Sequence, residues 1–259
     1  MEENKHYTGI KKSLDKPDEG SKIHKPGSKK YELLLFDLDD TLLDFEANEK
    51  VSLEKLFEDN GISFTREVFD IYDAVNKELW AGYEKGTISL NEVLNTRFSR
   101  TLLELGMTVD GTLWEAQYRA LLGRGYQLID GAFELCKDLS GSFRLFVITN
   151  GVTETQLSRL KMTNLYPFFE DIFISQEIGY QKPAGEFFDY VKEHMKDFKA
   201  ESALVIGDSL SSDIKGGNLA GIDTCWINRK NITNTSDIQS TYTITKLAEL
   251  YGILGIGTF

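Results

Sequence analysis

The stretch "LLLFDLDDTLLDF", residues 33–45, places three carboxylates within four positions directly after a run of four apolar residues. A continuous apolar run of this length is typical of a strand that is buried on both faces. In an extended segment, residues i and i+2 face the same way, roughly 6–7 Å apart, so Asp37 and Asp39 could address one ligand together. The stretch therefore predicts a buried strand that ends in a polar site.

Further apolar runs of the same kind follow along the chain, with helical patterns between them. The runs span 145–149, 171–175, 204–208 and 224–228, and the helical patterns span 130–140, 154–164, 184–196 and 211–220. Buried strands that alternate with helices indicate an α/β fold, a Rossmann-like parallel sheet with helices on both faces. Right-handed crossovers then bring the carboxyl ends of the strands to one edge, where such folds bind ligands.

Two parts of the chain do not fit a simple alternation of strands and helices. Residues 48–128 are almost wholly helical in pattern, far longer than one crossover needs, and are predicted to form an inserted helical cap near the ligand edge. The α/β core then comprises 31–47 and 129–259, with hinges expected near 45–50 and 125–131. Residues 1–30 are rich in Lys, Gly, Ser, Glu and Asp without a periodic apolar pattern, and are expected to form a tail outside the fold.

Composition limits the partners of the chain. The formal net charge of -12 disfavours a nucleic-acid polymer or an acidic membrane surface as partner, and no apolar run approaches the ~18 residues of a membrane span. Two cysteines without metal-ligand spacing and the lack of a secretion signal favour a cytoplasmic protein with reduced thiols. The expected partner is a small anionic metabolite whose negative charge is balanced at the binding site by a metal ion or a few cationic residues.

Polar residues also end two later strands. Thr149-Asn150-Gly151 follows the second apolar run, Gly207-Asp208-Ser209 ends the fourth, and Asp213 comes five residues after Asp208. Carboxylates that gather without a matching basic cluster repel one another, and a hard divalent cation relieves that repulsion. The sequence thus predicts a magnesium site at the carboxyl edge.

Four motifs in order resemble those of the haloacid dehalogenase-like (HAD) hydrolases over about residues 31–250. They are Asp37-Leu-Asp39-Asp-Thr41, Thr149-Asn-Gly, the isolated Lys182-Pro, and Gly-Asp208 followed by Asp213. The resemblance implies a magnesium-dependent phosphomonoesterase that acts through an aspartyl-phosphate. Asp37 would be the nucleophile and Asp39 the general acid and base, while Thr149 and Lys182 would hold phosphoryl oxygens.

The resemblance also implies a metal site and the nearest substrate contacts. Magnesium, with manganese as the alternative ion, would bind Asp37, the backbone carbonyl of Asp39, and Asp208. Asp213 would support the metal, either directly or through its neighbours. Asn150 and Gly151, the other two residues of the second motif, would contact substrate.

Asp39 and the residues of the cap limit which of the family's reactions is expected. Carbon–halogen-cleaving members of the family lack the second aspartate, which disfavours dehalogenase activity. Phosphonate-cleaving members use a cap lysine as a Schiff base, and the cap lysines of this chain, at 50, 55, 77 and 85, are expected to be exposed helix residues. The intact motifs also argue against a non-enzymatic binding protein.

The stretch "YDAVNKELWAGYEKGTIS" (72–89), with "TLLDF" (41–45) and "GIDTCW" (221–226), is similar to a bacterial subfamily of pyrimidine nucleotide 5'-nucleotidases. That resemblance implies pyrimidine nucleoside monophosphates as substrates, with Asn76 and Trp80 in contact with the base. Trp80 and Tyr83 could equally just pack the cap. A sugar-phosphate or other small-metabolite phosphatase with the same core is the alternative function.

Overall fold

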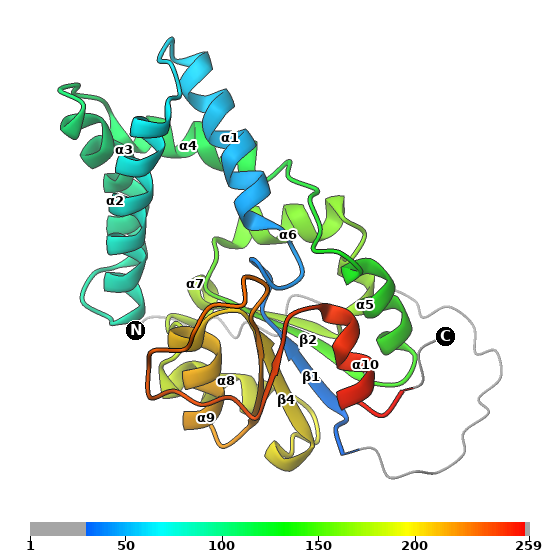
Figure 1. The fold of residues 1–259 in the computed structure, drawn as a ribbon. Helices are drawn as coiled ribbons and strands as arrows, with labels where there is room; N and C mark the ends of the chain where they lie inside the picture. The colour runs from blue at the N-terminus through cyan, green and yellow to red at the C-terminus, as the bar shows by residue number, and fades with distance from the viewer. Residues whose placement is uncertain (1–29, 257–259) are drawn as a thin grey trace, which may run out of the picture.

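The computed structural model describes residues 30–256. Its centre is a six-stranded sheet, and Figure 1 shows how the helices surround it. Every neighbouring pair of strands is parallel, in the order β3-β2-β1-β4-β5-β6. The strands are β1 (Leu33–Phe36), β2 (Arg144–Thr149), β3 (Asp171–Ile174), β4 (Ala203–Gly207), β5 (Asp223–Ile227) and β6 (Tyr242–Ile244). The expected α/β fold is confirmed, and β1, which carries the acidic motif, lies between β2 and β4.

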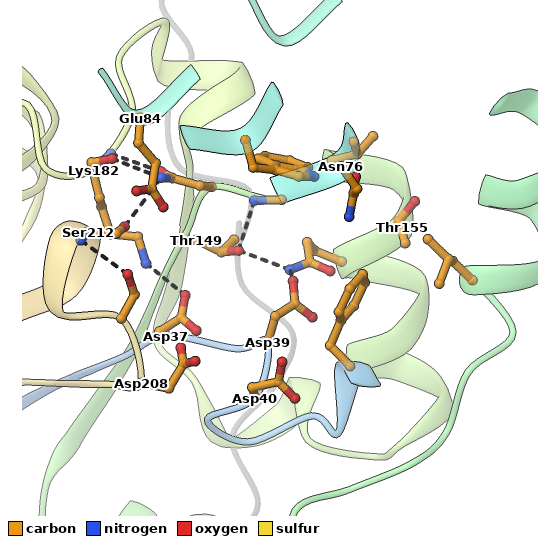
Figure 2. A pocket seen from close by; sticks show the side chains of 18 of the residues that line it. Asp37, Asp39, Asp40, Asn76, Glu84, Thr149, Thr155, Lys182, Asp208 and Ser212 are labelled. Atoms are coloured by element: carbon orange, nitrogen blue, oxygen red, sulfur yellow. Dashed lines mark hydrogen bonds and ion pairs between the residues drawn. The ribbon is translucent and has the colours of Figure 1, made fainter. Parts of the chain in front are cut away.

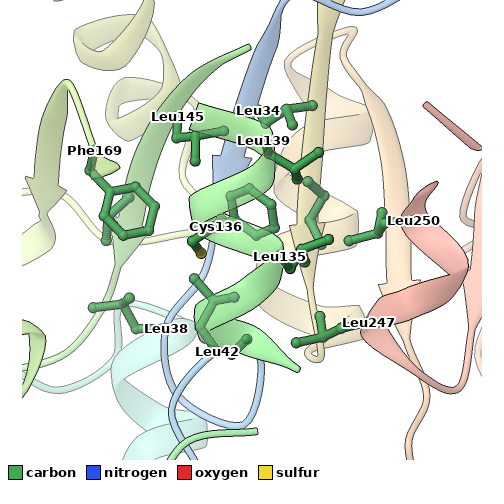
Figure 3. Close-up of a cluster of buried hydrophobic side chains, with 14 of the residues drawn as sticks. Leu34, Leu38, Leu42, Leu135, Cys136, Leu139, Leu145, Phe169, Leu247 and Leu250 are labelled. Carbon is green, nitrogen blue, oxygen red and sulfur yellow. The ribbon is translucent and has the colours of Figure 1, made fainter. Parts of the chain in front are cut away.

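Alternation along β1 assigns its side chains to two hydrophobic clusters, one on each face of the sheet. Leu34 and Phe36 belong to the cluster that includes Cys136 and Leu139 of α5, together with residues of α10 (Figure 3). Leu33 and Leu35 belong to the opposite cluster, which includes Phe187 of α8. The helices of the core are α5 (Ala132–Ser140), α6 (Thr153–Met162), α7 (Ser175–Ile178), α8 (Gly185–His194), α9 (Lys215–Leu219) and α10 (Leu250–Ile253).

Four helices, inserted between β1 and α5, stand away from the sheet (Figure 1). They are α1 (Phe45–Asp59), α2 (Arg66–Glu84), α3 (Leu90–Glu104) and α4 (Gly111–Leu122). An aromatic-rich cluster of their own fills the space between them. The chain enters and leaves this group along paired segments, because Asp44 N donates to Gln127 O at 3.1 Å and Ile129 N donates to Leu42 O at 2.9 Å.

The first helix of this group begins slightly earlier than the sequence predicts. The Asp44 side chain caps α1 by accepting a hydrogen bond from Ala47 N at 3.0 Å, so the helix starts at Phe45 instead of residue 48. The first expected hinge, 45–50, accordingly lies inside α1. The division into core and cap domains stays a prediction, and the expected tail 1–30 lies outside the described residues apart from Lys30.

Two elements of the core differ from the sequence prediction. Strand β6 was not expected, because only three residues form it and Thr243 faces solvent. The helical pattern 211–220 divides into a π-helical turn, Leu210–Ile214, and the short α9, which Gly221 ends at φ +70°. Within residues 30–256, no helix has the length and apolar character that crossing a bilayer requires.

Candidate active site

The carboxyl ends of β1, β2 and β4 open into a cavity of about 540 Å³ between the sheet and the inserted helices. All ten site residues expected from the sequence line this cavity. From the core come Asp37, Asp39, Thr149, Asn150, Gly151, Lys182, Asp208 and Asp213, and from α2 come Asn76 and Trp80.

Lys182 lies at the base of this cavity, with its ammonium group fully enclosed (Figure 2). Its Nζ donates to Asp37 Oδ1 at 2.7 Å, to Asp213 Oδ1 at 2.6 Å and to the carbonyl of Ile148 at 2.8 Å. Burial alone would lower the pKa of Lys182, but the carboxylates of Asp213 and Asp37 more than offset this and raise the pKa. The lysine therefore carries its charge, and its three donors are all used.

Asn150 holds the Lys182 backbone. Its side-chain Nδ2 donates to Lys182 O at 2.9 Å, and its Oδ1 accepts from Lys182 N at 2.8 Å. Both ends of the amide are thus engaged by one residue. Asn150 lines the cavity as expected, and the structure gives it the further task of positioning the lysine loop.

The carboxylates of Asp37, Asp208 and Asp213 form a cluster in which ligand oxygens all lie within 4.8 Å of one another. Burial raises the pKa of Asp37 to about 8 against the opposing charge of Lys182, and burial also raises the pKa of Asp208. Among residues 30–256, nothing forms a hydrogen bond or ion pair with the Asp208 carboxylate, whereas Asp213 Oδ2 accepts from Ser209 N at 3.1 Å. Lys182 thus leaves a surplus of buried negative charge, and all-oxygen donors suit a hard divalent cation such as Mg²⁺.

Asp39 lies beside this cluster and faces a different set of partners. Its Oδ2 accepts from Gln156 Nε2 at 2.8 Å, and its Oδ1 forms an ion pair with Arg159 Nη1. Gln156 Nε2 also donates to Thr149 Oγ1 at 2.9 Å. Gly151 is required here, because a Cβ at this position would lie 2.5 Å from Gln156 Nε2. The two carboxylates of the first motif therefore have separate surroundings, as two different roles would demand.

The α2 helix supplies the opposite wall. Asn76 and Trp80 line the cavity, and Arg97 of α3 donates to Asn76 Oδ1 at 3.4 Å. Tyr83 does not line the cavity, since its ring is buried and its hydroxyl shares a hydrogen bond of 3.1 Å with Ser175 Oγ. Packing is therefore the role that the structure supports for Tyr83.

Several residues of the site were missed by sequence reasoning. Gln156 and Arg159 are buried and face Asp39, and Arg97, Arg119 and Glu84 line the cap side of the cavity. The available signal was the spacing of Gln156 and Arg159 on one face of the helix after Thr149-Asn-Gly. The expected cap lysines 50, 55, 77 and 85 are exposed, as predicted.

A family model for haloacid dehalogenase-like hydrolases matches residues 31–221. The chain belongs to this family of hydrolases, as the four motifs indicated.

Three relatives show where in the family the chain falls. The HAD-hydrolase YfnB of Bacillus subtilis is 51% identical over 228 residues, which cover 88% of this chain and 97% of YfnB. The pyrimidine 5'-nucleotidases PynA of Streptococcus pneumoniae and YjjG of Escherichia coli are 39% and 35% identical, over 86% and 87% of this chain and 95% and 98% of theirs. More distant relatives include phosphatases of glyceraldehyde 3-phosphate.

The crystal structure of YfnB bound to magnesium superposes with a TM-score of 0.84 at 50% identity, covering 88% of this chain and all of that one. It is described as revealing interdomain movement. A magnesium-bound relative and the carboxylate cluster together support a metal site in this chain.

Proposed function

We propose that the protein is a cytoplasmic, magnesium-dependent phosphomonoesterase that forms an aspartyl-phosphate on Asp37 and acts on pyrimidine nucleoside 5'-monophosphates. The observation that carries the proposal is the pairing of Asp37 with the buried Lys182 at the base of a cavity whose other wall is α2. The identity to PynA and YjjG supports the choice of substrate.

The chemistry divides between the two carboxylates of the first motif. An oxygen of Asp37 attacks phosphorus, the bond to the leaving oxygen breaks, and that oxygen takes a proton from Asp39. A water molecule then attacks phosphorus, the bond to Asp37 breaks, and Asp39 takes the proton of the water. Phosphate and a nucleoside leave, and Asp39 is again protonated for the next cycle.

The remaining core residues of the site bind the negatively charged phosphoryl group or the metal ion that would neutralise it. Thr149 would hold a phosphoryl oxygen, and Lys182 would hold another by giving up one of its three present hydrogen bonds; Lys182 also offsets the charge of Asp37. The carboxylates of Asp37, Asp208 and Asp213, with the backbone carbonyl of Asp39, would hold Mg²⁺, or Mn²⁺ in its place. When bound, the metal would neutralise the charge of the phosphoryl group.

The cap side would receive the nucleoside. A volume of about 540 Å³ falls within the range of about 300–1,000 Å³ that small-molecule sites occupy. The half-buried Trp80 offers an apolar face to a base. The Asn76 amide, held by long contacts to Glu49 and Arg97, carries both a donor NH2 group and an acceptor oxygen. A pyrimidine carries both kinds of group on its edge.

A sugar-phosphate phosphatase is the second candidate. The polar side chains of Arg97, Arg119 and Glu84 on the cavity wall could bind hydroxyl groups, and relatives of this activity exist.

The test is phosphate release with Mg²⁺ from a panel of substrates. The panel comprises UMP, dUMP, dTMP, purine 5'-monophosphates, glyceraldehyde 3-phosphate and phosphoglycolate. We expect dUMP, UMP or dTMP to give the highest kcat/KM. Asp37→Asn should abolish release while circular dichroism shows an intact fold, and removal of metal with EDTA should do the same reversibly. A profile led by sugar phosphates would reject the nucleotidase proposal and keep the phosphatase chemistry.

A further inference from the structure

We propose that Gln156 and Arg159 of α6 are positioning residues that orient the Asp39 carboxylate for both proton transfers. This inference rests on the proposed function, because it assigns Asp39 the role of acid and base. Neither residue belongs to the four motifs.

The two side chains lie on one face of α6 and hold Asp39 by both of its oxygens. Gln156 Nε2 donates to Oδ2 at 2.8 Å, and Arg159 Nη1 pairs with Oδ1. Gln156 Oε1 in turn accepts from Arg159 Nη1 at 3.4 Å, so the two residues also brace each other. The second proton of Gln156 Nε2 goes to Thr149 Oγ1 at 2.9 Å, which ties Asp39 to a residue that is placed to meet phosphoryl oxygens. With both oxygens held, the carboxylate has few orientations left.

Burying Gln156 and Arg159 costs free energy of folding, so stability alone does not explain this arrangement. Gln156 and Arg159 are each 1% exposed, and the guanidinium lies 5.6 Å from the ring of Phe45. Arg159 Nη2 is buried and has no hydrogen-bond partner within the described part of the chain. An unmet buried donor costs about 1–3 kcal/mol, so a residue selected only for stability would not leave one. Arg159 instead lines the cavity, beside the group it pairs with.

The order of the two proton transfers explains why the Asp39 carboxylate has to be held in one orientation. Asp39 loses its proton to the leaving oxygen in the first step and must then face water as a carboxylate. The Arg159 charge stabilises that carboxylate between the steps, and Gln156 fixes its direction. A carboxylate free to rotate would still be present, but it would meet the water in the wrong geometry.

The test compares Arg159→Gln and Gln156→Met with the wild-type enzyme on two substrates. UMP needs a proton for its leaving oxygen, whereas 4-nitrophenyl phosphate does not, because nitrophenolate leaves unaided. We expect UMP turnover to fall by about 100-fold, the cost of a small misplacement of a catalytic group. With 4-nitrophenyl phosphate, rapid mixing should show a burst of about one nitrophenolate per enzyme at nearly the wild-type rate, followed by slow turnover. Arg159→Lys should recover part of the loss, since it restores the charge.

Arg144→Gln is the matched control, because Arg144 bonds Glu170 and the Lys196 carbonyl at the surface of the core. It should keep wild-type rates. Variants that keep UMP turnover within twofold would overturn the proposal. So would a loss that slows the nitrophenolate burst as much as turnover, because that would indicate general damage to the site. If Arg159→Gln does not fold, Gln156→Met decides by the same criteria. A wild-type enzyme that releases no phosphate from any substrate would instead reject the proposed function itself.

Discussion

At the scale of single residues, the site depends on charges that are buried together. Lys182 loses its hydration completely, and this cost is offset only because two carboxylates and one carbonyl accept hydrogen bonds from its three N–H groups. Without Lys182 the charged form of these carboxylates would be less stable, since burial already raises the pKa of Asp37. The charged residues of the site therefore stabilise one another, and the charge of each depends on the presence of the others.

The sequence identifies some of these residues and not others for a physical reason. Asp37 and Asp208 stand out because acidic residues end apolar runs, where a buried strand would not otherwise carry charge. Arg159 does not stand out, because a charged residue on a helix is ordinary until its buried face is known. The partner that explains it, Asp39, lies 120 residues away in sequence. Such pairings follow from the tertiary fold alone.

Glu49 of α1 gives a pH-dependent prediction away from the metal site. Its Oε1 accepts from the hydroxyls of Tyr72 and Tyr118 at 3.0 and 3.2 Å, and burial raises its pKa to about 7 from 4.5. The folded state therefore keeps a proton that the unfolded state releases. The resulting stability is fully present below pH 4.5 and is lost as pH rises through 7.

Glu49→Gln removes this titration. Relative to wild type, the variant should become more stable as pH rises from 5 to 7, by about 1–3 kcal/mol in total, and the difference should stay constant above pH 8. Urea unfolding at each pH measures it, with Glu104→Gln, an exposed change on α3, as the control for charge. A difference that does not vary with pH would contradict the assignment.

At the scale of elements, strand prediction succeeded where burial made the signal continuous. The four residues of β1 are all buried, and β4 and β5 carry similar runs. Strand β6 lacks that signal, because it has only three residues and Thr243 in its middle faces solvent. The π-helical turn 210–214 also leaves no mark in an apolar pattern, although it places Asp213 under Gly207. A Cβ at Gly207 would lie 2.2 Å from Asp213 Oδ2, so this approach depends on glycine.

Close packing of α9 on the sheet gives a second prediction. A Cβ at Gly217 would lie 2.6 Å from Thr224 Cγ2 and 3.2 Å from Val205 Cβ, both in strands. Gly217→Ala should lower the free energy of unfolding by about 1–3 kcal/mol, because overpacking outweighs the gain in helix propensity. Activity should fall as well, because Asp213 lies just before α9.

The matched control is Gly252→Ala in α10, where a Cβ would meet nothing within 4 Å. It should be neutral or stabilising by up to about 1 kcal/mol. Guanidinium unfolding midpoints compare the two variants, and equal effects of the two would show that α9 has room to shift.

At the scale of the whole molecule, the last turn of α2 joins the cap side to the core. Besides the Tyr83–Ser175 hydrogen bond, Gln181 Nε2 donates to Tyr83 O at 2.7 Å and Ser211 Oγ donates to Glu84 Oε2 at 2.9 Å. Two of these contacts reach the loops that carry the buried Lys182 and the half-buried Asp208. Sequence patterns predicted an inserted helical segment near the ligand edge but not these contacts, because they join residues that lie far apart in the sequence.

These contacts are the ones that opening of the cap would break, and closure would exclude bulk water from the proposed aspartyl-phosphate while the one attacking water remains. Tyr83→Phe removes one hydrogen bond from the closed arrangement and leaves the cavity lining intact. A hydrogen bond contributes about 0.5–1.5 kcal/mol net, so KM for a good substrate should rise about two- to tenfold. Single-turnover rates at saturating substrate should not change, because the chemistry occurs after closure.

Tyr251→Phe serves as the matched control, because the Tyr251 hydroxyl donates to Asp138 Oδ2 at 2.7 Å on the core, outside the cavity lining. Steady-state and rapid-quench kinetics of both variants separate binding from chemistry. If Tyr83→Phe left KM unchanged, or if Tyr251→Phe raised it equally, the last turn of α2 would not hold the cap closed. An equal rise in KM for both variants would have to arise from overall stability, which a thermal unfolding scan of the two variants would show directly.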